Sequence, residues 1–268
     1  MPSVKPKKFP KIILVGSGNV ATYLGKAIMN TPGFRIIQVF SPTIVNAKRL
    51  GQKLSVPFTN KWTEIYPDAD IFILAVNDDV IPECVKTLRT LIHKNALILH
   101  TSGSVSTDVF KSYFKYFGVI YPLQTFSIKK KSVAVSIPIL ITVQGRNTMA
   151  IVKQLAGSMS NDVRVVSDKT RLLIHLAAVM VNNFPNYWYV MAAQLLKSKK
   201  IEFEILLPLI EETTSKLKYL TPVDAQTGPA KRHDHKVIQL HEKILMDTFP
   251  EWKSAYHAMT TLIENHYK

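Results

Sequence analysis

The sequence contains a single cysteine, Cys84, among 268 residues. One cysteine excludes an internal disulfide and a zinc site built from several cysteines, and it favours a reducing compartment. Cys84 lies near Val80, Ile81 and Val85 in an expected helix. We therefore interpret it as a buried structural thiol rather than a nucleophile.

Long apolar runs are also missing. Residues 133–143 are too few to span a bilayer and include Pro138. Residues 1–10 are basic and contain proline, without the apolar segment of a secretory signal. We expect a flexible basic arm over residues 1–10, no membrane association and a cytoplasmic location.

Acidic residues are scarce. There are 19 Asp and Glu against 34 Lys and Arg, which gives a formal net charge of +15. Such a balance can serve nucleic-acid binding, but here the basic runs are scattered and are not interleaved with aromatic residues. We expect a basic solvated surface and no nucleic-acid partner. Part of the charge can attract a phosphate-bearing cofactor or an anionic substrate.

The sequence does contain a glycine-rich turn between an apolar strand and an amphipathic helix. Residues 16–21 read Gly-Ser-Gly-Asn-Val-Ala, after the apolar run 11–15. This is the dinucleotide-binding fingerprint, in which Gly16 permits the tight turn and Gly18 admits a pyrophosphate close to the backbone. Helix amides and the helix dipole would then face the phosphates. The predicted contacts come from Gly16, Ser17, Gly18, Asn19 and Val20.

The end of the expected second strand, residues 35–40, indicates which dinucleotide is bound. An acidic residue there would bond the ribose of NAD, but this chain has the neutral Ser41 and Thr43, with Lys48 and Arg49 following. We predict NADP, with NAD as the alternative. Ser41 and Thr43 could instead cap the next helix.

The apolar run 71–76 predicts another strand of the same sheet. Ligands lie at the carboxyl ends of such strands, so Ala75, Val76 and Asn77 are expected on the nicotinamide side. Asp78 and Asp79 follow, either as catalytic carboxylates or as caps of the next helix. We favour the capping interpretation.

Strands that are apolar throughout alternate with helical segments up to residue 166, which indicates an α/β doubly wound parallel sheet. From residue 167 only helical periods follow. We predict a Rossmann dinucleotide-binding domain over 11–166 and an all-α domain over 167–268. Its first helix would span 168–197 and be started, kinked or divided by Pro185, and the others would span 202–219, 236–246 and 251–267.

Several motifs resemble a family of Rossmann-like NADP oxidoreductases with a C-terminal helical domain of unknown function. They are the fingerprint and the segments 75–79, 100–103, 122–126, 176–179, 182–184 and 225–230. The chain also looks distantly related to pyrroline-carboxylate reductase, ketopantoate reductase, β-hydroxyacid dehydrogenases and prephenate dehydrogenase. This kinship implies a helical domain like that of 6-phosphogluconate dehydrogenase, dimerisation through that domain, and hydride transfer to a small carboxylate-bearing substrate in an interdomain cleft.

The resemblance also implies substrate contacts from the matched motifs, at Ser102, Gly103, Gln124 and Thr125. In two places the chain departs from the family pattern. Tyr121 stands where a histidine is expected, and His233 stands where a glycine is expected between Arg232 and Asp234. A side chain at position 233 occupies a place where the backbone needs conformational freedom.

The helical part supplies the candidate catalytic residues. His175, Asn182 and Asn186 are spaced to return to one face of a regular α-helix, and we expect these polar groups to be buried. His175 could relay a proton and Asn182 could orient the substrate, with Asn186 as a further contact. Equally, His175 could be a core histidine and the asparagines could fix the break before Pro185. The kinship adds Lys169 as a second proton donor, unless it is a solvated lysine.

A polar turn supplies the last candidates. Gln226 and Arg232 could contact the substrate, Arg232 by holding its carboxylate. An Arg232–Asp234 pair that braces the turn is the alternative. We predict no metal, because the neighbours His233, Asp234 and His235 would point in different directions.

The sequence thus predicts an NADP-dependent reductase or dehydrogenase. The alternative is a non-catalytic NADP-binding sensor or interaction protein.

Overall fold

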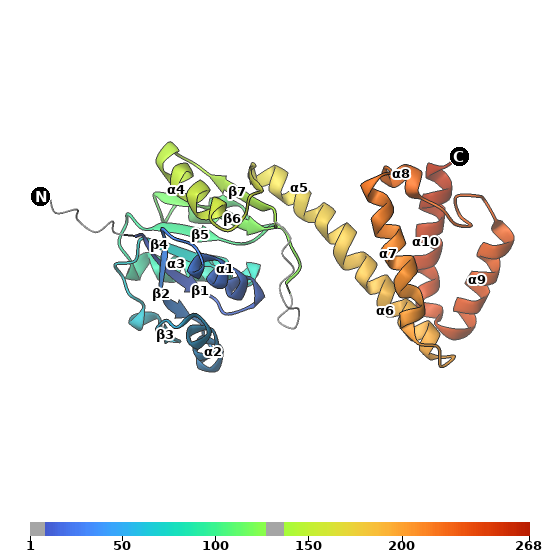
Figure 1. Ribbon diagram of the computed structural model, residues 1–268, viewed down its shortest axis with the longest axis horizontal. Helices are drawn as coiled ribbons and strands as arrows, with labels where there is room; N and C mark the ends of the chain where they lie inside the picture. The colour runs from blue at the N-terminus through green and yellow to red at the C-terminus, as the bar shows by residue number, and fades with distance from the viewer. Residues whose placement is uncertain (1–8, 127–136) are drawn as a thin grey trace, which may run out of the picture. The chain divides into compact units, whose positions relative to one another are not determined.

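The computed structural model describes residues 9–126 and 137–268 (Figure 1). Most of the predicted basic arm, residues 1–8, and the lysines 129–131 therefore lie outside the described residues. The chain divides into two compact units, 1–183 and 184–268. The helix that follows residue 167 thus groups with the first unit, whereas the sequence pattern placed a domain boundary before it.

An eight-stranded sheet organises the first unit, in the order β3-β2-β1-β4-β5-β6-β7-β8. All neighbouring strands are parallel except β6 and β7, which are antiparallel. An apolar run shows that a strand is buried but not its direction, so the sequence missed this reversal. The strands are β1 (Lys11–Val15), β2 (Arg35–Phe40), β3 (Phe58–Thr59), β4 (Ile71–Leu74), β5 (Leu97–His100), β6 (Tyr116–Pro122), β7 (Ile139–Val143) and β8 (Val163–Val165).

Helices connect these strands as the predicted doubly wound fold requires. They are α1 (Asn19–Met29), α2 (Ile44–Leu54), α3 (Ile81–Leu91) and α4 (Arg146–Gly157). Three 3-10 turns, η1 (Trp62–Glu64), η2 (Asp78–Val80) and η3 (Thr107–Phe110), lie between them. The Rossmann fold class is confirmed.

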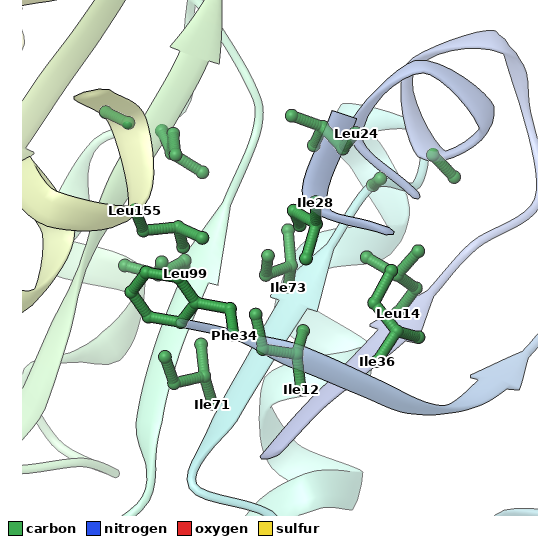
Figure 2. Packing of buried hydrophobic residues seen from close by; sticks show 14 of the residues in the cluster. Ile12, Leu14, Leu24, Ile28, Phe34, Ile36, Ile71, Ile73, Leu99 and Leu155 are labelled. Carbon is green, nitrogen blue, oxygen red and sulfur yellow. The ribbon is translucent and has the colours of Figure 1, made fainter. Parts of the chain in front are cut away.

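Each face of the sheet has its own apolar core. On β1, Ile12 and Leu14 belong to one cluster, whereas Ile13 and Val15 belong to the other. Figure 2 shows the first cluster, in which Leu24 and Ile28 of α1 face the strands. Cys84 of α3 is buried in the second, and burial, with the nearby charge of Glu83, raises the pKa of its thiol to about 11. The interpretation as a structural thiol is confirmed.

The helical segment after β8 is interrupted. It consists of α5 (Asp168–Ala178), a π-helical turn η4 (Val179–Asn183) and α6 (Phe184–Lys197), so the predicted division close to Pro185 is confirmed. The second unit continues with η5 (Phe203–Leu206), α7 (Leu207–Ser215), η6 (Lys216–Lys218), α8 (Pro222–Ala225), α9 (His235–Thr248) and α10 (Pro250–His266). The helix expected over 202–219, with Pro208 allowing a distortion, is not continuous: α7 carries Pro208 in its first turn, and 3-10 turns flank it. No helix within residues 9–126 and 137–268 has the length and hydropathy to cross a membrane.

Candidate functional site

Gly16 places the fingerprint turn against the end of β4. Its backbone has a φ of +118°, and a β-carbon at this position would lie 2.1 Å from the carbonyl oxygen of Ala75. Its N–H donates to the carbonyl of Phe40 at 2.8 Å, which ties the turn to the end of β2. Only glycine satisfies both the backbone angle and this close approach.

Gly18 opens α1 and leaves room for a ligand. It is the N-cap residue of α1, no side chain caps the helix, and no acidic residue occupies the first turn. A β-carbon at position 18 would meet no protein atom within 4 Å. Uncapped amides at the positive end of a helix dipole, with open space before them, suit a pyrophosphate.

Hydroxyl groups and cations surround the ends of β1 and β2. The Oγ atoms of Ser17 and Ser41 are buried and lie 2.8 Å apart, and Nη2 of Arg49 donates to the carbonyl of Ser17 at 3.4 Å. The Ser17–Ser41 pair and the Arg49 guanidinium therefore lie together at the ends of β1 and β2, where a Rossmann fold holds the ribose of its dinucleotide.

The capping alternative for Ser41 and Thr43 is not supported by their side chains. Thr43 is the N-cap residue of α2 but makes no side-chain capping bond. The hydroxyl of Ser41 bonds that of Ser17 instead.

The loop after β6 lies beside the fingerprint. Nδ2 of Asn19 donates to the carbonyl of Phe126 at 2.7 Å, and the rings of Tyr23 and Phe126 are 4.7 Å apart. Gln124 and Thr125 are exposed in this loop. The structure thus places these two predicted substrate contacts on the same side of the sheet as the fingerprint.

Asp78 binds the loop that follows β5. Its Oδ2 accepts from Oγ of Ser102 at 2.7 Å and from Oγ of Ser104 at 2.5 Å. The interpretation of Asp78 as a helix cap is wrong, because the cap positions of η2 and α3 are Asn77 and Val80 and neither carries a side-chain capping bond. The carboxylate connects the ends of β4 and β5, where Ala75, Val76 and Asn77 were expected to face the nicotinamide.

His175 of α5 reaches the same end of the sheet. Its Nδ1 shares a hydrogen bond of 3.0 Å with the hydroxyl of Tyr121, which lies on β6. A β-carbon at Gly103 would lie 2.5 Å from that nitrogen, so the imidazole packs directly on the β5 loop. Burial, and then the charge of Asp78, raise the pKa of Tyr121. Tyr121, Gly103, Asp78 and His175 form one cluster, which we call the Tyr–His cluster.

A buried arginine fixes α5 in place. Arg171 is fully buried and donates to Oγ1 of Thr142 at 2.6 Å, to Oδ1 of Asp168 at 2.6 Å and to the carbonyl of Val105. Asp168 also accepts from the backbone and hydroxyl of Thr107. Burial alone would raise the pKa of Asp168, but these hydrogen bonds and the Arg171 charge lower it. One helical turn separates Arg171 from His175, so this anchor also positions the imidazole.

Sequence reasoning missed Arg171 and undervalued Tyr121. An arginine four residues before His175, in a helix rich in leucine, is a detectable signal, because such a side chain must find buried acceptors or extend to solvent. The sequence pattern marks Tyr121 only as a replacement for an expected histidine. Its hydroxyl instead bonds a histidine from another element.

The other candidates on α5, η4 and α6 lie at the surface. Lys169 is exposed, and Asn182 is exposed and donates to Oδ1 of Asn183 at 3.5 Å. The expected buried polar stripe is wrong, because Asn186 is exposed as well and the π-helical turn breaks the regular α-helix on which the spacing argument depended. Any catalytic role of Lys169, Asn182 or Asn186 stays a prediction.

In the second unit, Arg232 is exposed and Gln226 is half-buried. Asp234 caps α9 by accepting from the N–H of Val237 at 3.3 Å. Within the residues that the structure describes, no ion pair joins Asp234 to Arg232, so the bracing alternative is wrong. His233 has a φ of +53°, a left-handed backbone conformation. This is the conformation that the glycine expected at this position would adopt most easily. In the described parts of both units, no group of three or more His, Cys, Asp or Glu could hold a metal.

Comparisons with known proteins agree with this geometry. The crystal structure of the "putative NADP oxidoreductase BF3122" of Bacteroides fragilis is 36% identical in sequence. It covers 96% of this chain and 98% of its own, with a TM-score of 0.90. The chain belongs to this family of Rossmann-like oxidoreductases with a C-terminal helical domain.

Further matches concern the C-terminal part of the chain and the fold. Residues 137–263 match a family model described as a domain of unknown function, DUF2520. Protein TM1727 of Thermotoga maritima is 22% identical, covers 96% of this chain and 98% of its own, and has a TM-score of 0.70. The imine reductase of Myxococcus stipitatus in complex with NADP+ is 13% identical, covers 96% and 93%, and has a TM-score of 0.69. No curated protein matches the chain.

Proposed function

We propose that the protein is an NADP-dependent reductase or dehydrogenase that acts on a small, carboxylate-bearing substrate. The observation that carries this proposal is the uncapped start of α1 at Gly18, with open space before it and Ser17, Ser41 and Arg49 beside it. The uncapped helix start suits the pyrophosphate, and Ser17, Ser41 and Arg49 suit the 2′-phosphate. The names of the B. fragilis and M. stipitatus structures, both of which mention NADP, support the same cofactor.

The Tyr–His cluster supplies the proton chemistry. When bound, NADP carries the hydride, and the protein orients the substrate and moves a proton. His175 can give a proton to the substrate heteroatom as the carbon is reduced, or take it in the reverse direction. Arg232, whose guanidinium forms no ion pair among the described residues, is our candidate for the substrate carboxylate.

Cofactor binding can be tested with a matched pair of glycine variants. Neither Gly18 nor Gly157, at the end of α4, has a protein atom within 4 Å of a built β-carbon. The fold should therefore accept both Gly18→Ala and Gly157→Ala. Titration of NADPH fluorescence should show affinity weakened roughly tenfold or more, about 1.4 kcal/mol, by Gly18→Ala and unchanged by Gly157→Ala. Equal affinity for all three proteins, or no binding at all, would contradict the proposal.

Turnover separates the enzyme from the alternative, a non-catalytic sensor. Keto, imino and hydroxy acids should be screened with NADPH and NADP+. Oxidation of NADPH that is lost in His175→Ala supports an enzyme. Binding without turnover, with His175→Ala unchanged in every assay, supports the sensor.

We further propose a homodimer formed through the second unit, in the cytoplasm. Many large apolar side chains of this unit are exposed in the single chain, including Tyr219 at 86% and Ile205, Leu209, Leu240 and Leu262 at more than half. So many exposed large apolar side chains favour an interface that buries them. Sedimentation equilibrium of the whole chain should give twice the mass of 30.3 kDa, and a monomer at micromolar concentration would refute the dimer.

A further inference from the structure

The hydroxyl of Tyr121 lies 3.0 Å from Nδ1 of His175, and the two rings meet edge to face with centroids 5.8 Å apart. We propose that Tyr121 is a positioning residue that fixes the tautomer of His175. This inference rests on the proposed function, because it concerns the same proton donor. Nothing in the sequence pattern or in the comparisons assigns a role to Tyr121.

Three contacts leave the imidazole little freedom at its Nδ1 side. Gly103 lies against Nδ1, Cγ and Cβ of His175. Asp78 holds the Gly103 loop through Ser102 and Ser104, and Arg171 holds the helix one turn earlier. Nδ1 is therefore directed at Tyr121. In the described parts of the chain, no hydrogen bond occupies Nε2, so this nitrogen is available to a substrate.

The chemistry of the two partners determines which nitrogen carries the proton. Tyr121 is half-buried within the electrostatic influence of Asp78, and both effects hold it as a neutral phenol. A neutral phenol donates readily, so its O–H bonds the bare Nδ1 of a neutral imidazole and the hydrogen resides on Nε2. If the imidazole is protonated, the same oxygen accepts from Nδ1–H. In both forms Nε2–H is the donor presented to a substrate.

The consequence for reduction is a defined proton path. Protonated His175 gives the Nε2 proton to the substrate oxygen or nitrogen as the hydride joins the carbon, and the neutral imidazole remains. This neutral imidazole carries its hydrogen on Nδ1. Nε2 then takes up a proton from solvent and Nδ1 releases its proton to solvent, which restores the Nε2–H tautomer and turns the Tyr121 hydroxyl from acceptor to donor. Tyr121 therefore gains and loses no net proton.

The test observes the tautomer directly and needs neither substrate nor cofactor. Two-bond ¹H–¹⁵N correlation spectra of the ¹⁵N-labelled chain report which imidazole nitrogen is protonated, and the His175 signals are those missing in His175→Asn. We expect the Nε2–H form in the unmodified protein and a mixture of tautomers in Tyr121→Phe. Tyr116 is another tyrosine of β6, and its hydroxyl forms no hydrogen bond to the described residues. Tyr116→Phe should therefore leave the His175 signals unchanged.

Each outcome decides the proposal. An Nδ1–H form in the unmodified protein, or the same single tautomer in Tyr121→Phe, overturns it. Should Tyr121→Phe not fold, Gly103→Ala provides the second variant, because it displaces the imidazole and leaves the hydroxyl in place. NADPH titration of the same samples reports separately on the proposed function. A fixed tautomer without NADPH binding would defeat that function alone, and binding with an unfixed tautomer would defeat only this inference.

Discussion

His175 and Gly103 are in direct contact, and a β-carbon on Gly103 would lie 2.5 Å from Nδ1 and 3.0 Å from Cβ of the histidine. The glycine has an ordinary backbone angle, so its role is to admit the imidazole rather than to form a turn. This contact brings a loop of the sheet together with a helix that begins more than sixty residues later.

Gly103→Ala should displace His175 and break its bond to Tyr121. The overlap should also destabilise the fold by about 1–3 kcal/mol, as overpacking commonly does. Denaturant unfolding measures this loss, and NADPH titration should show little change because the fingerprint is untouched. Gly157→Ala is the control, and the contact would be refuted if Gly103→Ala were as stable as that variant.

Gly16→Ala should be far more damaging than Gly18→Ala, although both change the same motif. At position 16 the new carbon would meet a backbone oxygen at 2.1 Å with a φ of +118°, whereas at position 18 it would meet nothing. We expect a loss of more than about 3 kcal/mol for the first and less than about 1 kcal/mol for the second. Thermal and denaturant unfolding provide the comparison, and similar losses would show that the turn is not built as described.

Arg49→Ala should weaken NADPH binding and spare NADH. The guanidinium approaches the backbone of Ser17 beside the Ser17–Ser41 pair. A hydrogen bond to a charged phosphate contributes about 1.5–3 kcal/mol, so the affinity for NADPH should fall roughly 10- to 100-fold. Lys48→Ala removes an equal charge from the preceding residue of α2 and serves as the control. Equal effects of the two variants on both cofactors would reject a specific phosphate contact.

The fold could be predicted from the sequence because local signals agreed with one another. The strand, turn and helix around Gly16 and Gly18 form a contiguous pattern, and apolar runs identify buried strands. The Tyr–His cluster joins residues from η2, the β5 loop, β6 and α5, whose proximity depends on the topology of the sheet. A π-helical turn also gives no periodic signal, so the alignment assumed for His175 and Asn186 failed. Arg171 was missed because two of its acceptors, Thr142 and Val105, lie on other segments, β7 and the loop after β5.

His233→Gly should be more stable than His233→Ala by about 1 kcal/mol. Position 233 has a left-handed φ of +53°, which costs a non-glycine residue about 1–2 kcal/mol, partly offset by the greater freedom of glycine when unfolded. Both variants lose the imidazole and its 3.4 Å contact with the Tyr267 carbonyl, so the comparison isolates the backbone. Unfolding midpoints measure the difference. An alanine variant as stable as the glycine variant would mean that the turn relaxes to another conformation.

His100 should make the protein less stable as the pH falls from about 6.5 to 4. The ring is fully buried, its Nδ1 accepts from the N–H of Ser102 at 3.2 Å, and burial followed by the Arg171 charge lowers its pKa to about 4. Above pH 6.5 the imidazole is neutral in both states and contributes no pH dependence. Below pH 6.5 the unfolded chain binds a proton at this imidazole more readily than the folded protein does, so the free energy of unfolding falls, by about 3 kcal/mol at pH 4.

His100→Asn keeps an acceptor near the Nδ1 position but cannot titrate. Urea unfolding of both proteins between pH 7 and pH 4 should give a smaller decline for the variant, because the carboxylates that titrate near pH 4 are common to both. Parallel curves would show that the buried imidazole does not resist protonation.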